Sequence, residues 1–171
     1  MTMGNTILRT ERLTLRELTS EDAAFINRLL NTPKFLEYIG DRGVKSDEDA
    51  RAFIEEKYRA SYRDNGYGLW VVETTNGTPV GMCGFVRRDT LPGPDLGFAF
   101  LPEHERQGYG YGSAAASMTY GHDQLGFTKV LAITTPHNEA SIGLLIKLGF
   151  TDDEFIEPQQ GEKLRLFSFT Y

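Results

Sequence analysis

Three glycines alternate with tyrosines in the stretch RQGYGYGSAAA, residues 106–116. Glycine allows backbone conformations that other residues avoid and it weakens a helix, so such a run is typical of a shaped turn. The alanines that follow favour a helix. A glycine-rich turn at the start of a helix presents backbone N–H groups and the positive end of the helix dipole to an anion. The stretch therefore predicts an anion-binding loop that leads into a helix.

Three familiar catalytic motifs do not fit this stretch. A P-loop needs Gly-x-x-x-x-Gly-Lys-Ser/Thr, which does not occur in the sequence. The dinucleotide-binding fingerprint would place its last glycine at Ser113, and the stretch follows a predicted hairpin late in the chain. A nucleophile elbow around Ser113 would need glycine where Tyr111 stands. The loop therefore belongs to another kind of anion site.

Metal and thiol chemistry are not indicated. His104, His122 and His137 lack the spacing of metal ligands, and we expect them on the surface or at helix ends. The acidic run 152–154 is typical of a solvated turn. Cys83 lies in an apolar stretch, where a free cysteine usually packs as a small apolar residue. We predict a site without a metal.

Composition narrows the class of protein. The chain has 171 residues, 18 Lys or Arg against 24 Asp or Glu, and a formal net charge of -6. This length fits one domain, residues 1–171, and the charge argues against a nucleic-acid-binding surface. One cysteine, and an N-terminus without the apolar core of a secretory signal, favour a reducing, cytoplasmic setting. No apolar run approaches the roughly 20 residues that span a bilayer, so we expect no membrane partner.

The N-terminal part predicts one strand and two helices. Residues 7–18 predict a half-buried strand, because Leu13 and Leu15 alternate there with the polar residues 12, 14 and 16. Residues 19–22 resemble a capping box, and a helical apolar stripe follows until Pro33. Ser46 opens a second capping signal, whose helical stripe ends at residues 65–66.

The remainder predicts strands and two further helices. The expected strands lie within residues 69–88 (two strands about the Asn76-Gly77 turn), 95–101, 129–135 and 163–171. The glycine run opens a helix that ends near Gly126, and Asn138 caps a helix that Gly149 closes. This order indicates an α+β fold, with a mixed, mostly antiparallel sheet flanked by helices.

These segments resemble the GNAT (Gcn5-related N-acetyltransferase) family. The similarity lies in LGFAFLPEHERQGYGYGSAA and in ITTPHNEASIGLLIKLGF. Gly108 and Gly110 stand at the family's glycine positions, whereas Glu105 replaces its usual Arg or Gln and Arg106 replaces a frequent glycine. The later motif is matched at Asn138, Ser141, Lys147, Gly149 and Phe150. The opening TERLTLREL is similar to the branch with ribosomal-protein N-terminal acetyltransferases, so the resemblance covers nearly the whole chain.

The resemblance implies acetyl-coenzyme A as cosubstrate and an amine as acceptor. Backbone N–H groups of the loop would hold the pyrophosphate, and the pantetheine amides would pair with the edge of strand 97–101 as an extra strand does. The expected coenzyme contacts are Phe98, Phe100, Leu101, Arg106, Gln107, Gly108, Tyr109, Gly110, Tyr111 and Asn138.

Acetyl transfer needs a neutral amine, a stabilised oxyanion and a proton for the thiolate. Some relatives use a tyrosine as the acid, but Leu145 stands at its position, and a carboxylate of other relatives falls on Ile133. Ser141 is therefore our candidate for contacting or protonating the thiolate, and Asn138 for orienting the pantetheine. The sequence indicates no general base.

The acceptor stays open at this level. The branch implies a protein N-terminus, and the alternatives are a small amine or amino acid, or a non-catalytic acyl-coenzyme A binder. Structural roles are also open, with Asn138 as a helix cap alone, Ser141 as a surface hydroxyl, and Phe98 and Phe100 as ordinary strand residues. The sequence fits a monomer or a homodimer.

Overall fold

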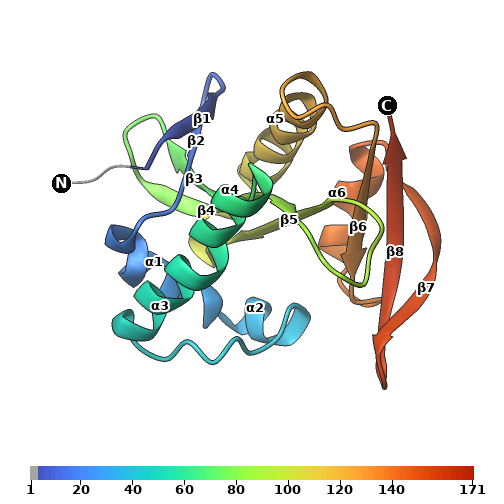
Figure 1. Ribbon diagram of the computed structural model, residues 1–171, viewed down its shortest axis with the longest axis horizontal. Helices are drawn as coiled ribbons and strands as arrows, with labels where there is room; N and C mark the ends of the chain where they lie inside the picture. The colour runs from blue at the N-terminus through green and yellow to red at the C-terminus, as the bar shows by residue number, and fades with distance from the viewer. Residues whose placement is uncertain (1–3) are drawn as a thin grey trace.

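One eight-stranded sheet organises the computed structural model, which describes residues 4–171 (Figure 1). The strand order is β1-β2-β3-β4-β5-β6-β8-β7, and β5 pairs with β6 in parallel while the other neighbours are antiparallel. The strands are β1 (Thr6–Arg9), β2 (Leu13–Arg16), β3 (Leu69–Thr74), β4 (Pro79–Val86), β5 (Asp95–Phe100), β6 (Lys129–Thr134), β7 (Thr151–Gln159) and β8 (Glu162–Thr170). The predicted mixed, mostly antiparallel sheet is confirmed.

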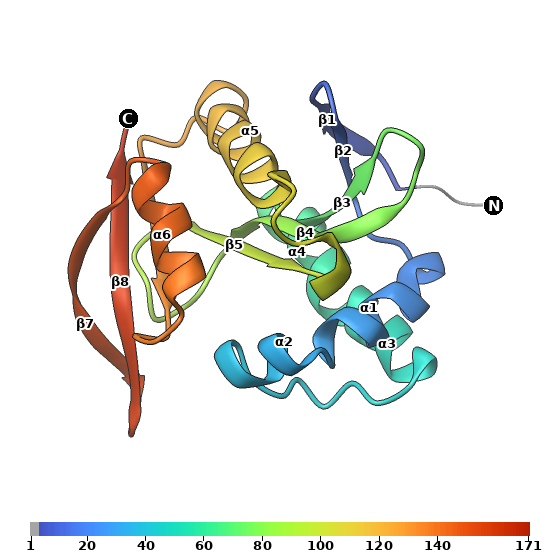
Figure 2. The same cartoon turned by 180° about the vertical axis from the view of Figure 1, so that it is seen from behind.

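Helices cover both faces of this sheet. They are η1 (Ser20–Asp22), α1 (Ala23–Leu30), α2 (Pro33–Tyr38), α3 (Asp47–Phe53), the π-helical η2 (Ile54–Arg59), α4 (Ala60–Asn65), η3 (Pro102–His104), α5 (Tyr109–Asp123) and α6 (Glu139–Lys147). Helices α5 and α6 lie on the face turned to the viewer in Figure 2, and α3 and α4 lie on the other face, in front in Figure 1. An apolar core fills each side, so the sheet separates α5 and α6 from α1 and α3.

Residues 7–18 form a hairpin instead of the single predicted strand. β1 and β2 are joined by a polar turn at residues 10–12, across which the N–H of Thr10 donates to the carbonyl of Leu13 at 2.8 Å. Residues 9–12 are four consecutive polar residues, and none of them is a Gly, Pro, Asn or Asp that would mark a turn. The alternation therefore located the extended segment but did not reveal the reversal.

Pro33 begins a helix, whereas the sequence analysis expected it to end one. Helix α1 ends at Leu30, and the Thr32 hydroxyl caps α2 by accepting the N–H of Phe35 at 3.3 Å. Proline has no N–H to donate and its φ suits a first helical position, so a proline after a hydroxyl residue also serves as a start signal.

The acidic run 152–154 lies in strand β7, so the expected turn is wrong. β7 is the edge strand beyond β8, and most of its side chains are exposed on both faces. Such a strand lacks the apolar alternation that marks a half-buried strand. The second helical stripe is confirmed over α3 to α4, and left-handed Gly66 ends it.

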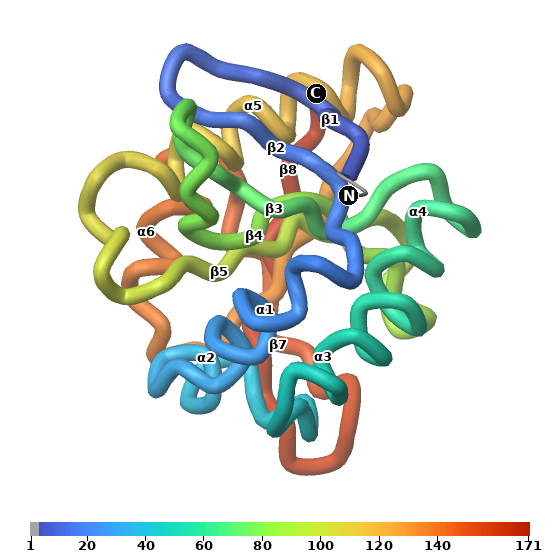
Figure 3. The backbone as a smooth tube through the Cα atoms, turned by 90° about the vertical axis from the view of Figure 1, so that its left-hand side faces the viewer, coloured from blue at the N-terminus to red at the C-terminus, as the bar shows by residue number. Residues whose placement is uncertain are grey.

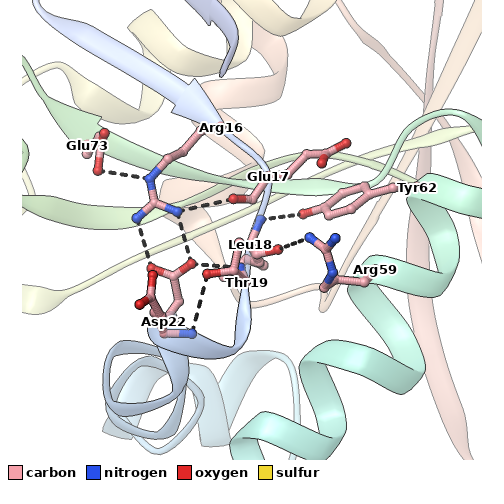
Figure 4. Close-up of polar contacts among 9 residues, drawn as sticks. Arg16, Glu17, Leu18, Thr19, Asp22, Arg59, Tyr62 and Glu73 are labelled. Atoms are coloured by element: carbon pink, nitrogen blue, oxygen red, sulfur yellow. Dashed lines mark hydrogen bonds and ion pairs between the residues drawn. The ribbon is translucent and has the colours of Figure 1, made fainter. Parts of the chain in front are cut away.

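A buried ion-pair network fastens the helical layer to the sheet (Figure 4). Arg16 of β2 donates to both carboxylate oxygens of Asp22, at 2.8 and 2.9 Å, and to Glu73 of β3 at 3.2 Å. The same Asp22 accepts the N–H of Thr19 at 2.9 Å, which confirms the predicted capping box. The bond to Asp22 raises the pKa of Arg16, so the guanidinium stays charged. Removing one partner would leave a buried charge unpaired, which is costly. The network therefore holds η1 against strands β2 and β3.

Tyr62 and Arg59 tie the second helical segment to the same place (Figure 4). The Tyr62 hydroxyl accepts the N–H of Leu18 at 3.0 Å and donates to Leu69 in β3, and Arg59 donates to the carbonyl of Leu18 at 2.8 Å. Burial raises the pKa of Tyr62, so the hydroxyl keeps its proton. The layer of α3 to α4 is thereby held on the side of the sheet opposite α5.

Candidate functional site

The sheet divides where β5 meets β6. These strands pair at Asp95 and Leu131, where the N–H of Leu131 donates to the carbonyl of Pro94 at 2.9 Å. Beyond this pair β5 runs across the molecule while β6 follows β8 (Figure 1). We call this divergence the fork, with its closed end at Asp95 and its open end at Phe100.

The edge of β5 along the fork carries the backbone groups of Phe98 and Phe100. In an antiparallel pair every second residue bonds the partner strand. The N–H of Leu101 donates to Val80 of β4 at 2.9 Å, so the odd-numbered residues of β5 face β4 and the even-numbered ones face the fork. The bond at the closed end, through the even-numbered residue 94, agrees with this alternation. The geometry supports the expectation that Phe98 and Phe100 present backbone groups to an extended ligand.

Leu101 lies outside this arrangement. Its N–H donates to Val80, its carbonyl accepts the N–H of His104 at 3.0 Å, and its side chain is 2% exposed in the core on the α1 side. The N–H of Leu101 is thus not available to a ligand, and the coenzyme contact expected at this residue stays a prediction. Leu101 instead holds the end of β5 against β4.

The loop after β5 leads straight into α5. Gly108 has φ 83°, a left-handed value that favours glycine, and it stands at the N-cap of α5 without a side-chain cap. The first bond of the helix runs from the N–H of Gly112 to the carbonyl of Gly108 at 2.9 Å. The N–H groups of residues 109–111 therefore have no intrahelical acceptor, as at any helix start. Together with the helix dipole, these N–H groups are suited to hold an anion.

Arg106 also has a left-handed backbone, with φ 60°. This conformation costs a non-glycine residue roughly 1–2 kcal/mol. Left-handed residues thus stand on both sides of Gln107 in the turn that leads into α5. The cost gives a physical reason for the glycine that the family often has at this position.

Helix α6 closes the far side of the loop. A Cβ atom at Gly110 would lie 3.6 Å from Leu144 of α6 and 3.7 Å from Phe100 of β5. The ammonium of Lys147 in α6 lies 4.3 Å from the ring centre of Tyr111. The glycine loop, the end of β5 and α6 thus meet at the open end of the fork.

Asn138 and Ser141 lie at the start of α6. The Oδ1 atom of Asn138 accepts the N–H of Ser141 at 3.3 Å, which confirms Asn138 as the helix cap. This cap leaves the Nδ2 amide as the group that could reach a coenzyme. Ser141 is half-buried and lies one helical turn before Leu144, so it shares the face of α6 that meets the loop.

We expect Ser141→Ala to lower turnover about tenfold to a hundredfold, because general-acid assistance is typically worth ~10²- to 10⁴-fold and a thiolate is a good leaving group. The dissociation constant of acetyl-coenzyme A should stay close to that of the wild type, since the proposed contact would form only with the departing sulfur. Steady-state kinetics and a binding titration test both statements. Wild-type turnover in this variant would make Ser141 a surface hydroxyl.

Apolar side chains occupy the two positions where some relatives have the tyrosine or the carboxylate. Leu145 is 1% exposed and belongs to the core beneath α5 and α6, and Ile133 of β6 is half-buried. Neither side chain can carry a proton. An acid and a base for the reaction must therefore come from other residues or from water.

Asp95 is a buried acid beside the fork that the sequence analysis did not single out. Its side chain is 1% exposed at the closed end of the fork, and Oδ2 accepts a bond from Nε of Arg88 at 2.7 Å. The other oxygen, Oδ1, is buried and has no hydrogen-bond partner in the described part of the chain. Burial raises the pKa of Asp95, and the charge of Arg88 opposes this rise. A buried carboxylate with one free oxygen and a raised pKa is suited to accept a proton. A lone acid at the start of the apolar run DLGFAFL was the only signal in the sequence.

Cys83 and His122 have surroundings that fit a structural role. Cys83 is buried, and burial raises the pKa of its thiol to about 11, so it remains protonated at neutral pH. Nδ1 of His122 lies 2.8 Å from the carbonyl of Phe127 just beyond α5. Within residues 4–171, no group of three or more His, Cys, Asp or Glu residues could hold a metal ion, and no helix has the length and apolar character to cross a membrane.

Comparisons with known proteins agree with this geometry. The family described as acetyltransferase (GNAT) domain matches residues 12–151. The Bacillus subtilis protein named uncharacterized N-acetyltransferase YoaA is 30% identical over 146 residues, which cover 84% of this chain and 82% of that protein.

Solved structures show the same fold at low sequence identity. Ribosomal-protein-S5-alanine acetyltransferase from Vibrio fischeri superposes with a TM-score of 0.79 at 17% identity, over 95% of each chain. Spermidine N-acetyltransferase from Vibrio cholerae, in complex with CoA and spermine, gives a TM-score of 0.77 at 20% identity, over 94% of this chain and 96% of that one. Because the family match runs from β2 to the start of β7 and includes the fork and the glycine loop, the chain belongs to the GNAT family of acetyl-coenzyme A-dependent N-acetyltransferases.

Proposed function

We propose that this protein binds acetyl-coenzyme A and a primary amine together in the fork and transfers the acetyl group directly between them. The observation that carries the proposal is the alignment of two recognition elements. The free edge of β5 at Phe98 and Phe100 runs directly into the glycine loop at the start of α5. Coenzyme A has peptide-like amides on one side of its pyrophosphate, so the amides could pair with the β5 edge while the pyrophosphate lies on the loop.

This orientation would place the thioester toward the closed end of the fork. The pyrophosphate would lie on residues 106–111, and the pantetheine arm would follow β5 backward past Phe100 and Phe98. The reacting end would then approach Asp95, which lies three residues before Phe98, or about 10 Å along the strand. Backbone N–H groups on this stretch of β5 would stabilise the oxyanion.

The chemistry then needs two proton movements. The amine nitrogen attacks the thioester carbon, the carbon–sulfur bond breaks, and the proton lost by the amine goes to the Asp95 carboxylate. The departing thiolate takes a proton or a hydrogen bond at Ser141. Because a thioester is already activated, alignment of the two substrates supplies much of the rate. No covalent enzyme intermediate is required.

We propose a protein N-terminus as the acceptor. The opening TERLTLREL and the structural likeness to a ribosomal-protein acetyltransferase support this choice. A net charge of -6 would attract basic protein substrates. A polyamine is the second candidate, because spermidine N(1)-acetyltransferase of Vibrio cholerae is 22% identical over 143 residues.

Binding and turnover can be tested separately. A ligand that binds only the folded protein stabilises it by about 2.7 kcal/mol at a hundred times its dissociation constant, so acetyl-coenzyme A should raise the melting temperature. Release of free coenzyme A should then depend on the acceptor, with N-terminal peptides, polyamines and amino acids tested in parallel. No thermal shift at saturating coenzyme would overturn the proposal. A shift without thiol release from any amine would favour the non-catalytic binder.

A further inference from the structure

Arg12 reaches the glycine loop from a distant part of the sequence. It lies in the turn between β1 and β2, which passes beside α5 (Figure 3). Oγ1 of Thr10 accepts the N–H of Leu13 at 3.0 Å and that of Arg12 at 3.3 Å, so the backbone of this turn is held. The Arg12 side chain therefore projects from a fixed base.

Two kinds of contact join Arg12 to the loop. Its Nη1 donates to the carbonyl of Gln107 at 2.8 Å, and its guanidinium carbon lies 4.8 Å from the ring centre of Tyr109. A Cβ atom at Gly108 would lie only 3.2 Å from the same Nη1, so glycine lets the guanidinium approach the backbone. The side chain thus contacts three successive residues of the loop.

The bond to Gln107 determines the direction of the next N–H group. In a trans peptide the carbonyl and the N–H of one plane point in opposite directions. Arg12 holds the Gln107 carbonyl on the hairpin side, so the N–H of Gly108 points away from the hairpin. Without this bond, the peptide between a solvent-exposed Gln107 and Gly108 could rotate, since glycine has wide conformational freedom.

We infer that Arg12 is a positioning residue for the coenzyme's pyrophosphate, acting through the loop backbone. This inference rests on the proposed use of the loop for acetyl-coenzyme A. A loop already held in its binding conformation loses less entropy when the ligand binds. Arginine suits the role better than lysine, because its planar group can donate to a carbonyl and stack on a tyrosine at once.

The test compares two acetyl donors that differ in the pyrophosphate. Acetyl-coenzyme A carries it, whereas S-acetylpantetheine lacks it and would use the β5 edge alone. We expect Arg12→Ala to raise the KM for acetyl-coenzyme A roughly tenfold, the range expected for a lost hydrogen bond to a charged group. The kcat/KM for S-acetylpantetheine should not change. Arg12→Lys should resemble Arg12→Ala, because it keeps the charge but loses the planar geometry.

Arg9 provides the matched control. It is an exposed arginine at the end of β1 in the same hairpin, so Arg9→Ala removes the same charge without touching the loop. We expect wild-type kinetics from this variant with both donors. An equal loss with both donors in Arg12→Ala, or an unchanged KM for acetyl-coenzyme A, would overturn the positioning role. A wild-type protein that fails to bind acetyl-coenzyme A would instead overturn the proposed function.

Discussion

Replacing Asp95 by asparagine should lower the turnover of amine acetylation by about 10²- to 10⁴-fold, the range that general acid–base groups contribute. Asparagine keeps the size of the side chain but cannot accept the proton of the amine. Arg88, the partner that loses its ion pair, has a side chain that is 38% exposed and can turn to water. The variant should therefore fold, with a dissociation constant for acetyl-coenzyme A close to that of the wild type.

The pH dependence of the reaction rate is a second test of Asp95 as the base. Burial raises the pKa of Asp95, so its carboxylate, the form that acts as a base, is lost as the pH falls through that raised pKa. The wild-type rate should fall on this acidic side, and the acidic limb should vanish in Asp95→Asn. In Arg88→Gln the positive charge that opposes the rise is removed, so the limb should move to higher pH.

The contribution of Asp95 to stability should decrease as the pH rises, because its pKa is raised in the folded state. A carboxyl group whose pKa is higher in the folded than in the unfolded state contributes stability at low pH, and this contribution is lost as the pH rises through the folded pKa. Asp95→Asn should remove that loss, so thermal melts at neutral pH should show a melting temperature no lower than that of the wild type. A variant with wild-type turnover and an intact acidic limb would show that Asp95 is not the base.

Placing a carboxylate at Gly110 should weaken acetyl-coenzyme A binding by about a hundredfold. Like charges about 5 Å apart repel by roughly 3 kcal/mol at an effective dielectric constant of about 20, which corresponds to a factor of that size. The side chain would start between Leu144 and Phe100, where the loop meets the open end of the fork. The helix dipole stabilises a negative side chain in the first turn, so Gly110→Asp should not unfold α5.

Gly110→Ala is the matched control for this substitution. Its Cβ would make only ordinary van der Waals contacts, at 3.6 and 3.7 Å, and the backbone at this position is not left-handed. We expect its affinity for acetyl-coenzyme A to stay within about threefold of the wild type. Calorimetric titrations at low and high salt separate charge repulsion from a steric effect. Salt screens charges, so the loss of affinity in Gly110→Asp should be smaller at high salt. Equal affinities of the two variants would remove the loop from the coenzyme site.

Local patterns in the sequence predicted many of the helices and strands and some of the turns around the candidate site. The glycine run, the Asn138 cap and the Asn76-Gly77 turn involve residues that are neighbours in the chain, so their types and spacing predict their structure. The edge strand β7 was missed because its side chains are exposed on both faces and show no alternation. The turn between β1 and β2 was missed because its residues 9–12 include no Gly, Pro, Asn or Asp to mark a reversal.

Contacts between distant segments could not be predicted in this way. Arg12 and Gln107 are 95 residues apart, and nothing in either local pattern indicates their bond. The buried carboxylate of Asp95 depends on its pairing with Leu131 and on the layers that cover both faces of the sheet. The sequence by itself therefore determined the glycine turn before α5 and the α+β order of elements, since both depend on short-range preferences. Only the tertiary structure decided which side chains lie at the closed end of the fork and which one holds the loop, because burial and direction arise from packing across the sheet.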